Sequence, residues 1–235
     1  MTLKYCSIIP VYNEQDIIRQ SVMDLVDNLR SLFGSEFEIL LCENGSRDNT
    51  ASLADGLATE FKEVRVLHLD TPDYGAALKA GILNTNAEII ICDEIDLGII
   101  DFYQRAVTLI EDNQASMVIG SKNMKGSDDE RPAIRRLATK SVNLLLSVSL
   151  GFKGTDTHGL KAFRKSRLES VVKQCVVTKD LFASEMVIRA QRCNVNIIEI
   201  PLALNEKRPP AINLFRRIPG VLRGIHTLVK TLGPR

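Results

Sequence analysis

The chain contains no tryptophan and no long apolar run among its 235 residues. Its longest apolar runs, such as residues 89–92 and 144–146, fall far short of the roughly 20 residues that cross a bilayer. The sequence therefore predicts no transmembrane helix. The apolar stretch near the start leads into Asn13 and Glu14 instead of a small-residue cleavage site, so we interpret it as a first strand and expect a cytoplasmic protein.

Cysteine is scarce, with five scattered residues and no C-x-x-C spacing. An odd number of cysteines without such spacing argues against a disulfide framework and against a cysteine-based zinc site. We expect most of these residues to be small, buried apolar side chains.

A strong net charge is also lacking, because 30 Lys and Arg residues stand against 29 Asp and Glu residues. The distribution is uneven, however. Seven basic residues and no acidic residue lie from Lys207 onward, which leaves a net charge of −6 on residues 1–206. With 45% hydrophobic and 25% charged residues, the composition is typical of a folded chain and excludes disorder. The sequence predicts one domain at residues 1–206 and a basic tail at 207–235, with no nucleic-acid partner.

Short β-rich runs alternate with longer helical patterns. The predicted strands lie at residues 5–10, 38–42, 64–69, 88–92, 116–120 and 196–204. The predicted helices begin near Asn13, as an N-cap, and near Gly75, and also cover residues 50–61, 100–113, 134–150 and 184–193. This alternation is typical of an α/β fold with a mostly parallel, Rossmann-like central sheet flanked by helices.

Polar residues cluster at the carboxyl ends of the predicted strands, where an open parallel sheet binds its ligand. They are residues 12–14 after the first strand, 43–48 after the second, 70–75 after the third, and Asp93, Glu94 and Asp96 after the fourth. Four acidic strand ends disfavour a bare anion but suit a ligand with hydroxyl groups, a base and a bridging cation. The pattern predicts a nucleotide-sugar site with Mg²⁺ or Mn²⁺.

Four ordered segments resemble the successive motifs of family 2 glycosyltransferases with the glycosyltransferase A fold. They are SIIPVYNE at residues 7–14, ENGSRDNT at 43–50, YGAALKAG at 74–81 and EID at 94–96. Later segments at residues 120–123, 134–143, 155–164 and 185–190 are similar to the polyprenyl-phosphate (dolichyl-phosphate) mannosyl- or glucosyltransferase branch. The resemblance covers about residues 5–205.

The resemblance implies a donor-nucleotide site formed by Pro10, Tyr12, Glu14, Glu43, Gly75 and Glu94. Glu43 would contact the base, but the usual Asp-Asp-Gly-Ser is Glu-Asn-Gly-Ser here, so the base preference stays open. Gly75 would let the backbone approach a phosphate. The alternative for Gly75 and for Gly81 is turn geometry or close helix packing.

The metal motif, usually Asp-x-Asp, is also altered, because residues 93–97 read DEIDL. Aligning Glu94 and Asp96 with the two acids keeps the following leucine, whereas starting at Asp93 places Ile95 at a ligand position. We therefore predict Glu94 and Asp96 as ligands of Mg²⁺ or Mn²⁺, with Asp96 the better candidate. The alternative is that these acids are merely solvated at a strand end.

Basic residues are expected on the acceptor side. The resemblance implies that Lys122, Arg135 and Arg136 bind the acceptor phosphate or the donor diphosphate, and Lys207 could equally meet the acceptor phosphate. It also implies that Asp156 positions the acceptor.

The residues expected to take part in catalysis are therefore Asp96, Asp156, Arg135 and Arg136. His158 stands where the family pattern usually has Ser or Thr, and we do not assign it as a general base.

The implied reaction is an inverting transfer of a hexose from a GDP-mannose- or UDP-glucose-class donor to a polyprenyl or dolichyl phosphate. A cation and basic side chains would stabilise the departing diphosphate. A lipid phosphate is already ionised near neutral pH, which fits a sequence without a convincing general base. The missing tryptophan excludes the processive synthases, which carry a Gln-x-x-Arg-Trp motif. The alternatives are a soluble or glycan acceptor, and a catalytically degenerate nucleotide-sugar-binding protein.

The tail contains an amphipathic helical pattern from Ile218, with Pro219 in its first turn. Its apolar residues span a stripe of about 120° at 100° per residue, and they are Val221, Leu222, Ile225, Leu228, Val229 and Leu232. This pattern is typical of an interfacial helix on anionic lipid, so we expect peripheral contact with the inner face of the membrane. The alternative is packing on the domain or on a second subunit of a homo-oligomer.

Overall fold

A seven-stranded sheet forms the centre of the molecule. The computed structural model describes residues 3–127, 133–203 and 214–233. Its strands follow the order β3-β2-β1-β4-β6-β5-β7, and β6 alone among them runs antiparallel to its neighbours. They are β1 (Tyr5–Val11), β2 (Phe37–Asn44), β3 (Val64–Leu69), β4 (Ile89–Cys92), β5 (Met117–Ser121), β6 (Lys161–Arg164) and β7 (Ile197–Pro201). The predicted mostly parallel α/β sheet is confirmed.

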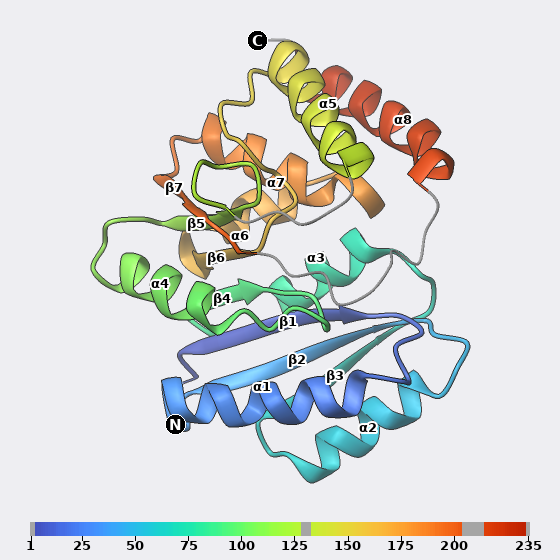
Figure 1. Cartoon of the computed structure of the whole chain (residues 1–235), viewed down its shortest axis with the longest axis vertical. Helices are drawn as coiled ribbons and strands as arrows, with labels where there is room; N and C mark the ends of the chain where they lie inside the picture. The colour runs from blue at the N-terminus through green and yellow to red at the C-terminus, as the bar shows by residue number, and fades with distance from the viewer. Residues whose placement is uncertain (1–2, 128–132, 204–213, 234–235) are drawn as a thin grey trace.

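Helices cover both faces of this sheet (Figure 1). On one face lie α1 (Ile18–Phe33), α2 (Thr50–Glu60) and α4 (Ile100–Glu111). On the other lie α3 (Tyr74–Asn84), α6 (Lys165–Gln174), the short 3₁₀ helix η1 (Lys179–Leu181) and α7 (Phe182–Arg192). Two further helices, α5 (Ala133–Leu150) and α8 (Leu214–Leu232), lie side by side at the end of the molecule farthest from α1 and α2.

The core is divided by the sheet into two apolar clusters. Alternate residues of β1 enter different clusters, because successive side chains of a strand point to opposite faces. Ile9 joins the cluster under α1, α2 and α4, whereas Cys6 and Ile8 join the cluster under α3, α6 and α7. Four of the five cysteines are buried, as predicted, and Cys193 is exposed.

The first helix begins later than predicted. Asn13 has a positive φ of 55° and does not cap α1, which begins at Ile18. The Oδ1 atom of Asn13 accepts a hydrogen bond from the Arg47 amide at 2.8 Å, so it is not available to the first turn of the helix. A long-range contact with the loop after β2 therefore replaces the predicted local cap.

One helix was not predicted at all. The sequence of α6 is strongly polar, and its buried side chains are Leu168, Val171 and Val172. Their i, i+3, i+4 spacing gives a narrow apolar stripe, which is the signal that identifies the helix in retrospect.

The C-terminal helix is longer than predicted and packs on the domain. It begins at Leu214, so Pro219 lies inside the helix and not in its first turn. Leu228 is fully buried, and most of the predicted apolar stripe packs beside it, namely Val221, Ile225, Val229 and Leu232. Arg192 donates to the carbonyl oxygens of Leu150, Leu232 and Gly233, which joins the ends of α5 and α8.

The stripe of α8 therefore belongs to the core, which was one of the alternatives that the sequence left open. The predicted boundary at residues 206/207 lies outside the described residues. Among the described helices, none is both long enough and apolar enough to span a membrane.

Close packing of α3 on the sheet depends on Gly81. A Cβ atom at this position would lie 2.6 Å from Cγ2 of Ile8 and 2.7 Å from Sγ of Cys42. We expect Gly81→Ala to lower the free energy of unfolding by about 1–3 kcal/mol, because a well-packed core resists added volume.

The matched control is Gly56→Ala on the exposed side of α2, where an added Cβ meets nothing within 4 Å. This control should raise stability by about 0.5–1 kcal/mol through helix propensity. Urea titration of both variants measures the difference, and equal stabilities would contradict the packing role of Gly81.

Candidate active site

The register of the parallel strands brings the predicted site segments to one edge of the sheet. Val11 pairs with Glu43, and Glu43 pairs in turn with His68, so the ends of β1, β2 and β3 lie level. Cys92 of β4 pairs with Ile8 of β1, and the Asp93 amide donates to the Ile8 carbonyl at 3.0 Å. The segment after β4 therefore begins beside β1, on the same edge.

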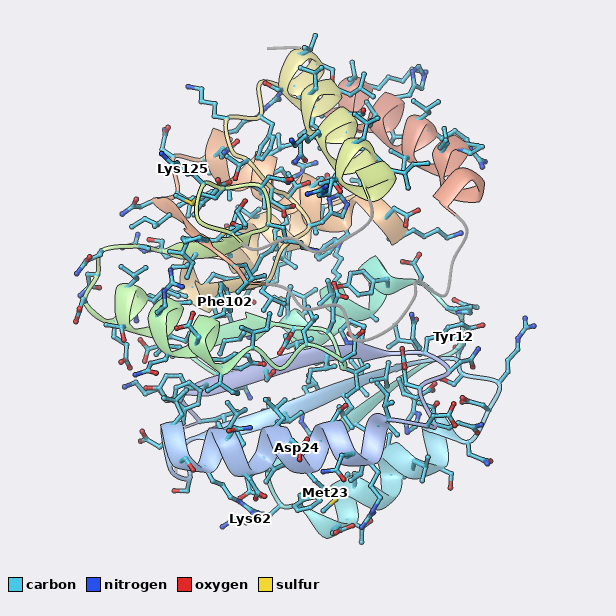
Figure 2. All side chains as sticks on the ribbon, in the orientation of Figure 1. Tyr12, Met23, Asp24, Lys62, Phe102 and Lys125 are labelled. Atoms are coloured by element: carbon cyan, nitrogen blue, oxygen red, sulfur yellow. The ribbon has the colours of Figure 1, made fainter. Side chains whose placement is uncertain are left out.

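Two loops at this edge are joined by hydrogen bonds. The Asn13 amide donates to Oγ of Ser46 at 3.0 Å, and the Glu14 amide donates to Oγ1 of Thr50 at 2.8 Å. These bonds hold the loop after β1 against the loop after β2. Pro10 is half-buried and Tyr12 is 37% exposed, and Figure 2 shows Tyr12 at this edge. The side chains predicted for the donor nucleotide thus lie on a fixed backbone.

Glu43 is more enclosed than predicted. Its side chain is buried, Oε1 accepts from the Ser46 amide at 2.6 Å, and Oε2 lies 3.4 Å from Nδ1 of His68. Burial opposes ionisation, but the hydrogen bonds from Ser46 and His68 together lower the pKa of Glu43. Glu43 therefore organises the loop after β2, and the half-exposed His68 beside it presents a ring that the sequence analysis missed.

His68 is held between two carboxylates. Its Nε2 atom lies 2.9 Å from Oδ1 of Asp55, and this contact raises the pKa of His68, with Glu43 acting in the same direction. The signal for His68 in the sequence is a titratable residue in a strand, one position before its end.

The acids after β4 differ in exposure. Asp93 and Ile95 are buried, whereas Glu94 and Asp96 are partly exposed. This alternation directs Glu94 and Asp96 away from the core, in agreement with the alignment that takes them as the acidic pair of the metal motif.

A buried polar network holds the segment from behind. Asp93 accepts from its neighbour, the Glu94 amide, at 2.7 Å and from the Tyr103 hydroxyl at 2.7 Å. The Tyr103 hydroxyl also lies 2.6 Å from Oγ of Ser7 in β1. Burial raises the pKa of Asp93 to about 7. The network fixes the start of the 93–97 loop on β1 and α4, so Asp93 has a positioning role in place of a ligand role.

The pair Glu94 and Asp96 can be tested for its fit to a cation. Within the described residues, no three His, Cys, Asp or Glu side chains gather as a complete metal site. Mg²⁺ is commonly held by one or two carboxylates together with substrate phosphates, and Mn²⁺ also prefers oxygen ligands. Two partly exposed carboxylates therefore fit a cation that arrives with a donor diphosphate.

Gly75 lies near the start of α3. It is buried, and a Cβ there would lie 2.6 Å from Cβ of Phe182 and 2.8 Å from the Lys179 amide. Asp73 caps α3 by accepting from the Ala76 amide at 2.9 Å, and the same oxygen accepts from the Lys179 amide at 2.7 Å. Gly75 is therefore needed for close packing of α3 on η1, which is the alternative that the sequence left open, and its contact with a phosphate stays a prediction.

Asp156 also has a structural position. It is fully buried, and its carboxylate accepts from the Lys122 amide at 3.2 Å and from the His158 amide at 2.8 Å. It therefore ties the end of β5 to the loop before β6, and its role in positioning the acceptor stays a prediction. Because β6 is antiparallel, this loop lies at the same sheet edge as the ends of β4 and β5.

The predicted basic residues are only partly placed. Lys122 is half-buried directly after β5, and Arg136 is exposed near the start of α5. Arg135 lies in the same helix, but its side chain is outside the described set, and Lys207 falls in the segment 204–213, which is also outside it.

Lys161 is a buried cation that sequence analysis missed. It is 4% exposed, and its Nζ donates to the Gly159 carbonyl at 2.7 Å. Burial lowers the pKa of Lys161 to about 8, although Asp156 acts in the opposite direction. The neighbouring His158 contacts the Asp180 carbonyl through Nε2 at 2.9 Å, and burial lowers its pKa too. A charged residue in the otherwise apolar run 160–163 is the signal that could have identified Lys161.

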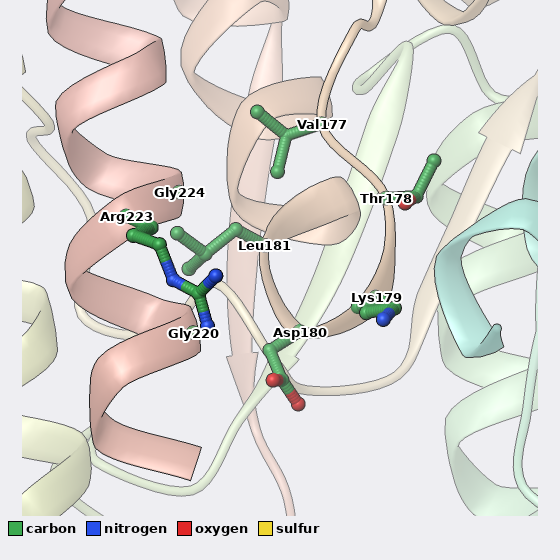
Figure 3. Close-up of a pocket in the computed structure, with 8 residues that line it drawn as sticks. All are labelled: Val177, Thr178, Lys179, Asp180, Leu181, Gly220, Arg223 and Gly224. Atoms are coloured by element: carbon green, nitrogen blue, oxygen red, sulfur yellow. The ribbon is translucent and has the colours of Figure 1, made fainter.

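A pocket outside this edge lies between η1 and α8 (Figure 3). Gly224 permits the close approach of the two elements, since a Cβ there would lie 2.6 Å from Cδ1 of Leu181. None of the residues predicted for the site lines it; the lining residues are Val177, Thr178, Lys179, Asp180, Leu181, Gly220, Arg223 and Gly224.

Solved structures share this architecture. Glucosyl-3-phosphoglycerate synthase from Mycobacterium tuberculosis, in complex with UDP, matches with a TM-score of 0.67 at 19% identity, over 99% of this chain and 81% of that chain. Mannosyltransferase PcManGT from Pyrobaculum calidifontis, in complex with GDP-Man and Mn²⁺, matches with a TM-score of 0.65 at 16% identity, over 99% and 66%. The chain has the glycosyltransferase A fold that was predicted.

The family follows from the sequence match. The model of glycosyl transferase family 2 matches residues 6–171, which is well over half of the chain and includes β1 to β6. The chain belongs to glycosyl transferase family 2, as the motifs indicated.

Curated relatives are similar at 26–28% identity. Glycosyltransferase AglD of Haloferax volcanii is 26% identical over 91% of this chain and 35% of its own length. A dolichyl-phosphate beta-glucosyltransferase of Trichomonas vaginalis is 26% identical over 85% of this chain and 63% of its length. An undecaprenyl-phosphate mannosyltransferase of Micrococcus luteus is 28% identical over 87% and 85%. The chain thus spans only part of the first two relatives.

Burial of Lys161 makes stability depend on pH. Its pKa in the folded chain, about 8, lies below the ordinary value of 10.5, so the unfolded chain binds more protons between these pH values. Stability therefore rises with pH through this window, and the full penalty applies below pH 8.

We expect Lys161→Met to raise the free energy of unfolding at pH 7 by about 2 kcal/mol, since the charge penalty of about 3 kcal/mol exceeds the lost hydrogen bond of about 1 kcal/mol. Urea unfolding at pH 7, 8.5 and 10 checks the change. The variant should lose the rise in stability with pH, and an unchanged profile would show that Lys161 is not the group responsible.

Proposed function

We propose that the protein is an inverting hexosyltransferase that moves a sugar from a nucleoside diphosphate of the GDP-mannose or UDP-glucose class to a polyprenyl phosphate. The observation that carries the proposal is the partly exposed pair Glu94 and Asp96 at the end of β4, in a chain of glycosyl transferase family 2. Two relatives, named as a dolichyl-phosphate glucosyltransferase and an undecaprenyl-phosphate mannosyltransferase, support the acceptor class.

The donor would bind along the edge formed by β1, β2 and β4. Pro10 and Tyr12 would contact the nucleotide, and His68 lies beside Glu43 at the position expected for the base. Glu94 and Asp96 would hold Mg²⁺ or Mn²⁺, which when bound neutralises the charge that develops on the leaving diphosphate. The Asp93, Tyr103 and Ser7 network keeps these two acids in place.

The acceptor would attack the anomeric carbon from the side of β5 and α5. A phosphate monoester is ionised near neutral pH, so its oxygen attacks without prior removal of a proton. Asp156, beside the end of β5, would position the acceptor and is not assigned to proton abstraction. Lys122 would attract the acceptor phosphate as a point charge, and Arg136 would do so through its planar guanidinium. Because a soluble donor and a lipid acceptor meet at an interface, we place the reaction at a membrane surface, on its inner, cytoplasmic face.

Asp96→Asn tests the cation role. The change keeps the side-chain size but removes the charge, so kcat/KM with Mn²⁺ should fall at least about 100-fold. The exposed Asp24 on α1 lies away from the site edge (Figure 2), and Asp24→Asn is the matched control with wild-type turnover. Thermal unfolding of both variants should match the wild type, and full activity of Asp96→Asn would refute the assignment.

A panel of labelled donors tests the reaction itself. GDP-mannose, UDP-glucose and UDP-GlcNAc are each incubated with Mn²⁺ and a short polyprenyl phosphate, and the label is measured in the organic phase. We expect transfer from one hexose donor into the organic phase. If the label instead appears in the aqueous phase on an added soluble sugar, the acceptor is that sugar and not a lipid phosphate. If no donor is transferred or hydrolysed, a degenerate binding protein is favoured.

A further inference from the structure

The outer face of α5 is apolar and exposed to solvent. Five large apolar side chains of this helix are between 46% and 75% exposed, and they are Ile134, Leu137, Leu144, Leu145 and Val148. At 100° per residue they fall within about 100° of arc, so they lie as a stripe on one face of the helix, where the exposed Ser141 separates Leu137 from Leu144. Soluble monomers rarely expose so many large apolar side chains on one face without a partner.

The stripe is not the face by which α5 packs on the domain. Leu146 and Leu150 are fully or almost fully buried in the core, and Asn143 donates to the Thr155 carbonyl at 2.7 Å. These residues lie on the opposite side of the helix from Leu137 and Val148. The helix therefore has two apolar faces, of which the protein itself covers one.

The neighbouring helix extends the exposed surface. On α8, Leu222 is 53% exposed at the margin of the stripe that packs on the core, and Ile218 is 47% exposed at the N-terminal end of that stripe. Figure 1 shows α5 and α8 side by side, and contacts between them confirm that they are neighbours. The sequence predicted membrane contact through the whole α8 stripe, and the structure leaves only this margin available.

Charge on the two helices has one sign. Neither α5 nor α8 contains an Asp or Glu residue in its sequence. Lys140 lies on the flank of the α5 stripe, Arg136 is exposed farther round the helix toward its packed face, and Arg223 and Lys230 are exposed on α8. An apolar stripe flanked by basic side chains complements a bilayer with anionic headgroups. A second copy of the chain would instead bring a surface of the same charge.

We propose that the outer stripe of α5, continued by Ile218 and Leu222 of α8, lies on the surface of an anionic lipid bilayer. The apolar side chains enter the boundary between headgroups and acyl chains, while Lys140 remains at the level of the lipid phosphates. This contact with the bilayer depends on the exposed surface and not on the transfer reaction. If the acceptor is a lipid phosphate, this orientation places it near the start of α5, where Arg136 lies.

Vesicles without any polyprenyl phosphate test the surface independently of catalysis. The full chain is mixed with vesicles of phosphatidylcholine, with or without 30 mol% phosphatidylglycerol, which is about one anionic lipid in three and supplies a negative surface potential. The fraction of protein that floats with the vesicles is then measured in a sucrose gradient. We expect binding to the anionic vesicles to be at least about 10-fold stronger and to weaken with salt. The variant Leu144→Gln/Val148→Gln should reduce the partition coefficient at least about 10-fold, because binding scales with buried apolar area.

The matched control is Val176→Gln, an apolar residue that is 55% exposed but lies on neither helix, and it should float like the wild type. Equal thermal unfolding of all three proteins shows that folding is intact. The proposal is overturned if the wild type does not float, or if the double variant floats as well as the wild type. It is also overturned if sedimentation shows a concentration-dependent dimer that only the double variant abolishes, since a second copy would then cover the stripe.

Two separate assays distinguish failure of the transfer reaction from failure of the bilayer contact. Transfer to a short polyprenyl phosphate in detergent tests the proposed function, and flotation tests the surface. Flotation without transfer would leave the bilayer contact standing and remove the acceptor assignment.

Discussion

The hydrogen-bonded register between β1 and its two neighbours is the constraint on which the site depends. Val11 is level with Glu43, and Ile8 is level with Cys92, so three segments that are far apart in the sequence end at one edge. A slip of one residue in β4 would turn Glu94 and Asp96 toward the core and Asp93 and Ile95 toward solvent. The buried hydrogen bond that the Tyr103 hydroxyl donates to Asp93 opposes such a slip, because its loss would leave a buried carboxylate without this donor.

The acidic side chains at this edge lie at two depths, buried and accessible. The buried acids Glu43, Asp93 and Asp156 each accept hydrogen bonds from backbone amides and hold loops in place. The more accessible acids, Glu94 and Asp96, project beyond them. Lys161 places one positive charge beneath this acidic surface, at a cost that its lowered pKa reflects. Of these five acids, the three buried ones hold the loops of the edge, and the two accessible ones remain for contact with a ligand.

Local patterns in the sequence predicted the strands well. The predicted bounds of β3 agree with the structure, β1 and β4 differ by one residue at one end, and β5 differs by one residue at each end, because buried strands have short, dense apolar runs. The family motifs were equally reliable for fold and family, since their order along the chain is itself specific.

The sequence was less informative where a residue's partner lies far away in the chain. Asn13 resembles a local helix cap but accepts a hydrogen bond from the Arg47 amide. Gly75 and Asp156 were predicted as ligand contacts, and the structure adds tertiary contacts with Phe182 and with the Lys122 amide that no local pattern indicates. In each case the local sequence does not show which distant residue makes the contact. The α8 stripe misled for the same reason, because periodicity shows that a helix has an apolar face but not what covers it.

The reversed direction of β6 marks the boundary between two groups of strands in the sheet. Residues from β1 through the loop after β4 form the proposed donor half without interruption, whereas the proposed acceptor half is assembled from β5, α5, the loop before β6 and α8. The halves meet in the sheet mainly where β4 pairs with β6. Substitutions in the second half could therefore change the acceptor and the surface on which the enzyme works, while the strand ends that would hold the sugar donor keep their positions.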